Sequence, residues 1–119
     1  TDFTAKLVDV RPDGYAHNIA EGVIRARFRE SLSNPTLITP GEVYGYTIDL
    51  WATSHVFKAG HRLRLEVSSS NFPRYDRNLN SGDTGVDATV SHIAHQQIYH
   101  TPRYPSHIVL PIIPAISNR

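Results

Sequence analysis

The stretch from Gly60 to Arg74, GHRLRLEVSSSNFPR, carries the clearest local signal in the sequence. Leu63, Leu65 and Val67 alternate with charged residues, so a strand here has one apolar face and one charged face. Three serines and an asparagine then end the alternation, and a proline cannot donate a hydrogen bond to a sheet. We therefore predict a strand that presents a polar loop, with one aromatic residue and one arginine, at an edge of the fold.

Alternating segments of the same kind recur along the chain, about ten residues apart and separated by turn signals. No long window has the periodicity of a helix. Besides the strand at 63–67, we predict strands at 3–10, 15–18, 23–28, 42–51, 96–100 and 107–113, with a turn at Glu21-Gly22 before the strand at 23–28. This pattern indicates an all-β domain, either a sandwich or a jelly roll. Residues 71–86 have no periodicity and are expected to form a long loop.

Length and composition suit one domain that spans residues 1–119. The net charge is +1, without a basic or acidic run, so nothing indicates a nucleic-acid partner. No apolar stretch is long enough for a membrane span, and the absence of cysteine excludes disulfides and thiol chemistry. The chain has no methionine and opens at Thr1 directly into a strand-like pattern, so we expect a fragment of a larger protein. The sequence does not indicate the cellular compartment of the protein.

The serines after the Leu63 strand are the first candidates for catalysis. A nucleophile elbow needs a glycine two residues before and two residues after the serine, and then a helix. Ser68, Ser69 and Ser70 lack both glycines, and the following Phe72-Pro73 opposes a helix. We therefore predict no catalytic residue in this chain and assign these hydroxyls to the end of a strand.

Two groups of residues could hold a metal ion. His92 and His95 lie close to His100 and Asp87, but their spacing brings ligands together on a helix and not on a strand. The loop from 78 to 87 offers Asp83 and Asp87 for calcium without the spacing of a known motif. We predict no metal and no other cofactor, and the histidines leave an independent zinc enzyme as an alternative.

Exposed aromatic and polar residues leave two kinds of binding open. A carbohydrate-binding module could use Trp51, Tyr15, Tyr75, Arg74, Asp76 and Asn78. An interface with a partner domain could use Phe72, Trp51 and four outward arginines, Arg25, Arg27, Arg62 and Arg64. The interface explains Phe72-Pro73 better, because this pair lies on a polar loop with no obvious core partner.

Several segments, in order along nearly the whole chain, resemble one known family. They are DFTAKLVDV (2–10), PDG (12–14), GVIRAR (22–27), PG (40–41), FxxGHRLRL (57–65), SSSNFPR (68–74), NxN (78–80), IYH (98–100), PS (105–106) and LP (110–111). Together they resemble the C-terminal domain of the X-prolyl dipeptidyl peptidase / cocaine esterase class of serine hydrolases. Each segment is modest alone, and the ordered set is specific.

The resemblance implies a jelly-roll β-sandwich of the galactose-binding-like kind. In that family the catalytic residues lie in an α/β-hydrolase domain that precedes the jelly roll, and none of its motifs is present here. The resemblance therefore implies an accessory domain whose partner is the catalytic domain of the same polypeptide, with self-association into homo-oligomers as a further expectation. The interface or pocket-wall candidates are Ser70, Asn71, Phe72, Pro73, Arg74 and Trp51. The family also includes acylases and amino acid ester hydrolases, so the substrate class does not transfer, and a stand-alone carbohydrate-binding module remains the alternative.

Overall fold

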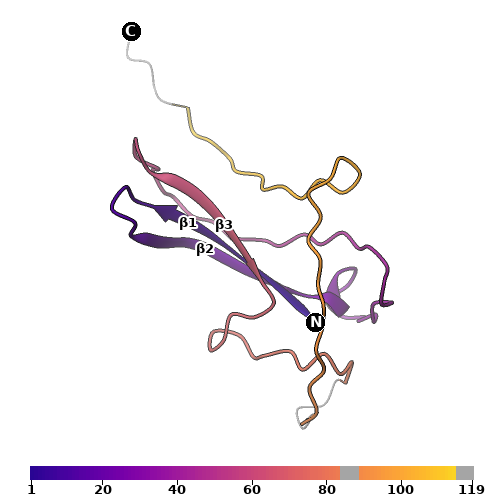
Figure 1. The fold of residues 1–119 in the computed structure, drawn as a ribbon. Coiled ribbons are helices and arrows are strands. Elements are labelled where there is room, and N and C mark those ends of the chain that lie inside the picture. Colours follow the sequence, from indigo (N-terminus) through magenta and orange to yellow (C-terminus); the bar gives the residue numbers. More distant parts are fainter. Residues whose placement is uncertain (84–88, 115–119) are drawn as a thin grey trace.

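The computed structural model describes residues 1–83 and 89–114. Its strands are β1 (Asp2–Val10), β2 (Ala16–Arg25) and β3 (Arg62–Ser68), and a short 3₁₀-helix, η1 (Ala26–Phe28), follows β2. The strands form one antiparallel sheet in the order β2-β1-β3, with β1 in the middle (Figure 1). The domain is all-β, as predicted.

Strand β1 forms the core of the domain. Ala5 lies opposite Gly22 on one side and Val67 on the other, so β1 is paired along both of its edges. Apart from Gly22 and Ala26, the buried residues in the described part of the chain belong to this strand. The predicted strand at 3–10 is therefore confirmed.

Strand β2 differs from its prediction. We expected two short strands at 15–18 and 23–28 with a turn at Glu21-Gly22, but one continuous strand pairs with β1 and η1 occupies residues 26–28. The pairing of β1 with β2 shifts its register once, between Leu7 and Val8. Gly22 is required by a close contact and not by a turn, because a Cβ at residue 22 would overlap the Asp49 carbonyl oxygen.

Strand β3 agrees with its prediction. It pairs antiparallel with β1 from Arg62 opposite Val10 to Ser68 opposite Thr4. Leu63, Leu65 and Val67 share one face, which lines a wide cavity of about 2300 Å³. Arg64 and Glu66, on the other face, form an ion pair with an N–O distance of 3.0 Å.

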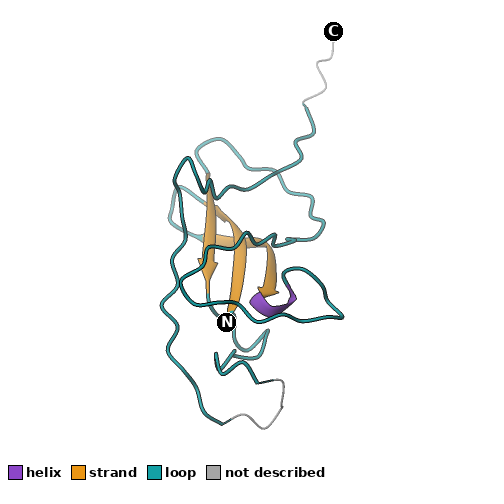
Figure 2. Ribbon diagram, turned by 90° about the vertical axis from the view of Figure 1, so that its right-hand side faces the viewer, coloured by secondary structure: helices purple, strands orange, loops and turns teal. Residues whose placement is uncertain are grey.

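The strands predicted at 42–51, 96–100 and 107–113 are not found among the residues that the structure describes. These segments join no ladder and are drawn as loops in Figure 2. His100, at the end of one of them, forms an isolated bridge with Pro105. The 42–51 segment instead crosses the sheet, with the Tyr46 ring 4.8 Å from the Phe3 ring. An alternating sequence produces an assigned strand only where a neighbouring strand supplies hydrogen bonds. The two-sheet arrangement of a jelly roll therefore stays a prediction.

No helix in residues 1–83 and 89–114 is long and apolar enough to cross a membrane.

Candidate domain-interface site

The loop after β3 is held at both ends by one carboxylate of β2. Asn71 Nδ2 donates to Glu21 Oε2 over 2.8 Å, and Arg74 Nε lies 2.8 Å from Glu21 Oε1. Within the loop, the Arg74 and Tyr75 amides both donate to the Asn71 carbonyl and form a tight turn. The contact with the Tyr75 hydroxyl and the charge of Glu21 raise the pKa of Arg74, so its guanidinium stays charged. The loop is therefore fixed to the sheet by polar contacts.

The middle of this loop projects away from the sheet. Phe72 is 62% exposed, and the guanidinium carbon of Arg77 lies 5.2 Å from the centre of its ring. The Phe72–Pro73 peptide bond is cis. Ser70, at the start of the loop, donates its amide to Ser68 Oγ over 3.4 Å. The structure thus presents an apolar ring on a loop whose ends are polar and anchored.

Glu21 is the residue whose loss should free the loop. We expect Glu21→Gln to weaken both contacts, because an amide loses the charge that Arg74 pairs with and one of the two acceptor oxygens. Backbone NMR order parameters of residues 71–74 should fall from about 0.85 to about 0.6 or lower. Glu66→Gln, which alters an exposed ion pair on β3, is the matched control and should leave these values unchanged. Unchanged order parameters in Glu21→Gln would contradict the anchoring role.

A shallow groove of about 450 Å³ adjoins the loop. Sequence reasoning missed it, because its apolar wall comes from residues far from the loop in sequence. Its lining residues are Asp2, Val23, Ile24, Arg25, Phe28, Leu32, Arg74, Tyr75 and Asp76. The groove and the Phe72 loop form one continuous candidate surface, because both include Arg74. We call it the Phe72 surface: residues 70–74 together with the residues that line this groove.

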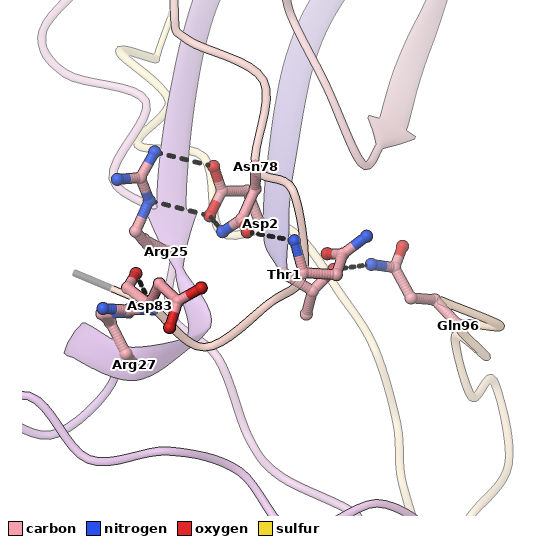
Figure 3. A network of polar contacts seen from close by, with 8 residues as sticks. Thr1, Asp2, Arg25, Arg27, Asn78, Asp83 and Gln96 are labelled. Carbon is pink, nitrogen blue, oxygen red and sulfur yellow. Dashed lines mark hydrogen bonds and ion pairs between the residues drawn. The ribbon is translucent and has the colours of Figure 1, made fainter. Parts of the chain in front are cut away.

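Polar contacts also hold the chain beyond the loop against the sheet (Figure 3). The buried Asp2 receives two hydrogen bonds from Arg25, at 3.1 and 3.3 Å, and one from Asn78 Nδ2, at 2.6 Å. Arg27 donates to the Asp83 carbonyl oxygen over 3.0 Å. Two of the four arginines that we expected to face a partner domain, Arg25 and Arg27, are therefore engaged within the chain.

Trp51 does not join the Phe72 surface. It is 79% exposed, and it lines the wide cavity, which none of residues 70–74 reaches. Its backbone lies in the left-handed region, with φ 64°, which is uncommon for a bulky residue. The Trp51 amide donates to Asp49 Oδ1 over 2.7 Å, and this bond closes the turn that leaves the ring exposed. The residues considered for carbohydrate binding are also separated in the structure. Trp51 lines the wide cavity, whereas Arg74, Tyr75 and Asp76 line the groove described above.

Among the residues weighed for catalysis and for metal binding, Ser68, Ser70 and His92 make hydrogen bonds within the chain. The Ser68 carbonyl accepts a hydrogen bond from the Thr4 hydroxyl, and the Ser68 hydroxyl accepts one from the Ser70 amide. The His92 backbone bonds to Leu79 and Asn80. In residues 1–83 and 89–114, no group of three or more His, Asp or Glu side chains has an arrangement that could hold a metal ion. Asp87, proposed for both metal sites, lies outside the described residues.

The described residues form an all-β domain built on one three-stranded antiparallel sheet, and this fold gives the class of domain to which the chain is compared. A model of the X-Pro dipeptidyl-peptidase C-terminal non-catalytic domain matches residues 1–109. The chain belongs to this family of non-catalytic domains, within the X-prolyl dipeptidyl peptidase / cocaine esterase class of serine hydrolases.

Similar proteins are much longer than this chain. It is 55% identical over 115 residues to the cocaine esterase of Rhodococcus sp. strain MB1 Bresler, a match that covers 95% of this chain and 20% of that protein. Two mycobacterial proteins named as serine esterases, from Mycobacterium bovis and Mycobacterium tuberculosis, are each 27% identical over 128 residues, covering 93% of this chain and 19% of theirs. The chain therefore spans about a fifth of the length of the relatives that it matches, as expected for one domain of a larger polypeptide.

Proposed function

We propose that this chain packs against the catalytic α/β-hydrolase domain of the same polypeptide and helps to shape its substrate pocket. The observation that carries the proposal is Phe72, an exposed aromatic ring on a loop fixed at both ends by Glu21. Aromatic side chains on rigid supports are typical anchors of interfaces. The neighbouring groove supplies apolar side chains and the charged Arg74 and Asp76, so it offers an apolar contact with a polar margin.

The shape of the chain supports a covered position in a larger protein. The radius of gyration is 17.4 Å, whereas a compact domain of this length has about 13.5 Å. The accessible surface is 9742 Å² for a mass of 13.3 kDa, against roughly 6,500 Å² for a compact protein of that mass. Many large apolar side chains are exposed, including Leu63 and Val67 on β3 and Ile112 near the end of the described chain. Such surface is typical of contact with further polypeptide.

The wide cavity under the sheet points the same way. At about 2300 Å³ it exceeds the roughly 300–1,000 Å³ of small-molecule pockets more than twofold. Protein interiors are close-packed, so further polypeptide is the fitting occupant of an apolar space of this size. Under this proposal residues 1–119 belong to one jelly-roll β-sandwich of the galactose-binding-like kind, and homo-oligomers are a further means of covering the same surface.

The reaction of the parent protein is part of the proposal. A serine esterase transfers an acyl group to water through a serine ester, with an oxyanion hole to stabilise the tetrahedral intermediates. We place the nucleophile, its base and the oxyanion hole in the part of the polypeptide outside this chain. The chain itself then acts on the reaction only by support and by shaping the pocket.

An activity assay on the full-length parent tests the proposal. Phe72→Ala should lower kcat/KM for an activated ester about tenfold, because removing an interface anchor displaces the pocket wall. Tyr15→Ala is the matched control: it removes an exposed aromatic ring near the far end of β1 and should leave kcat/KM unchanged. The chain alone should hydrolyse no ester. Turnover by the chain alone that is lost on Ser69→Ala, or equal kcat/KM for both parent variants, would contradict the proposal.

A further inference from the structure

Near the end of β1, the buried carboxylate of Asp9 holds two histidines. Its Oδ1 lies 2.8 Å from His61 Nδ1, and its Oδ2 lies 2.8 Å from His55 Nε2. Asp9 is only 3% exposed. Both histidines belong to the loop between the segment that crosses the sheet and β3, so one side chain of the central strand holds this loop at two points.

We propose that Asp9, His55 and His61 form a latch that keeps the loop 52–61 closed against the sheet and that opens only when the carboxylate itself is protonated. The latch lies at the rim of the wide cavity, which His55, His61 and Trp51 all line. It therefore controls how firmly the loop and the neighbouring Trp51 are held over that cavity.

The groups around Asp9 are few. On β2, His17 lies opposite Asp9 in the ladder, and its ring centre is 6.1 Å from that of His55. On β3, the residue opposite is the apolar Leu63, while Arg62 and Arg64 lie opposite Val10 and Val8, whose side chains point to the other face. The loop adds Phe57, which packs against the His55 ring at 4.9 Å, and Lys58, whose carbonyl accepts the His61 amide. Among the described residues, the titratable groups that face the carboxylate are thus three histidines.

Both charge states of the histidines keep the latch shut. A neutral imidazole donates one N–H, and a protonated one donates both, with a stronger, charge-assisted bond to a carboxylate. Protonation of His55 or His61 therefore strengthens the bond to Asp9. Protonation of the Asp9 carboxylate weakens the latch, because one of its two acceptor oxygens becomes a hydroxyl that donates a hydrogen bond.

The electrostatics of Asp9 give the sign of the pH dependence. Burial raises the pKa of Asp9, but the hydrogen bonds and charges of His61 and His55 together lower it by more, so the pKa lies below its ordinary value of 3.8. A lowered pKa in the folded state adds stability that is present above the unfolded-state pKa. This stability is lost as the pH falls through the folded-state value. The loop should therefore stay closed through mild acid and open below the usual carboxylate range.

Trp51 makes the test direct, because it is the single tryptophan of the chain and lies four residues before His55. Time-resolved fluorescence anisotropy of the chain, recorded from about pH 8 to about pH 2, measures how freely this segment moves on the nanosecond scale. In the wild-type chain, the fast component should stay small until the pH falls below the ordinary carboxylate range. In Asp9→Asn, whose amide accepts at one oxygen only, the fast component should be at least about twofold larger at neutral pH and independent of acid.

Asp13→Asn is the control, since it removes an exposed carboxylate that accepts a hydrogen bond from the Tyr15 amide, and it should behave as wild type. Far-UV circular dichroism is recorded in parallel. If Asp9→Asn does not fold, His55→Phe is used instead. It removes one of the two bonds to Asp9 and keeps the bond to His61, and it should show the same gain in mobility. The proposal is overturned by unchanged mobility in the variant, by opening of the wild type between about pH 7 and 5 where histidines titrate, or by loss of the sheet at the pH at which the loop opens.

Discussion

Replacing Gly22 by alanine should destabilise this domain by about 2 kcal/mol or more, the cost of overpacking against backbone. A Cβ at residue 22 would overlap the Asp49 carbonyl oxygen and lie 3.0 Å from the Ile48 Cγ2 atom. The obstacle is main chain, which cannot rotate away as the tip of a side chain can. The segment that crosses the sheet must therefore shift, and its contact between Tyr46 and Phe3 must shift with it.

Gly45 supplies the matched control for this substitution. It lies in the same crossing segment, and a Cβ there would have no atom within 4 Å. Gly45→Ala should leave stability unchanged or raise it by up to about 1 kcal/mol, because alanine restricts the unfolded chain. Thermal unfolding followed by circular dichroism should show a melting temperature lowered by about 8 °C or more in Gly22→Ala. Equal melting temperatures for the two variants would show that residues 48–49 do not cross β2 as described.

Removing the Asp2 carboxylate should have the second large effect. Asp2→Ala removes two hydrogen bonds from Arg25 and one from Asn78, at a side chain that is almost fully buried. Breaking a fully buried ion pair costs about 3–5 kcal/mol. The Arg25 side chain is 41% exposed and can turn to water, so we expect a loss of about 2 kcal/mol.

A double-mutant cycle measures how much of this loss belongs to the pair. With Arg25→Ala as the second change, the coupling energy should be about 1 kcal/mol or more in urea unfolding. The same cycle on Arg64 and Glu66, whose side chains are 46% and 44% exposed, should give about 0.5 kcal/mol or less. A coupling for Asp2 and Arg25 no larger than that of the exposed pair would refute the role assigned to the buried carboxylate.

The parts of the fold that the sequence predicts correctly are those in which local pattern and pairing agree. In β1 and β3 the apolar residues alternate, and each strand has a neighbour that supplies hydrogen bonds. The same alternation in residues 42–51 was misleading, because this segment has no partner strand in the described chain. At Gly22, local turn propensity favoured a break, but the approach of Asp49 decides the residue type. Contacts of that kind join distant positions and leave no periodic trace.

The candidate site divides in the same way. The polar composition and the Phe72-Pro73 pair identified the loop at residues 70–74, and the structure shows that its Phe72 side chain is exposed. Glu21, which anchors the loop, and Asp2, which holds the chain beyond it, looked like ordinary charged positions of strands, because a bond across 50 or 76 residues of chain has no local signature. The Asp9 cluster was missed for the same reason. In contrast, the absence of a nucleophile elbow was readable directly from the missing glycines around the serines.

The order β2-β1-β3 has a consequence for how this chain behaves in solution. One long side of β2 and one of β3 have no strand beside them in the described residues. Backbone amides and carbonyls along those sides can pair with any extended peptide that reaches them. A neighbouring segment of the parent can extend the sheet there, and so can another copy of the chain. Concentrated solutions of the isolated chain should therefore form aggregates by edge-to-edge strand pairing. Dilution, or an added peptide that pairs with these edges, should suppress that aggregation.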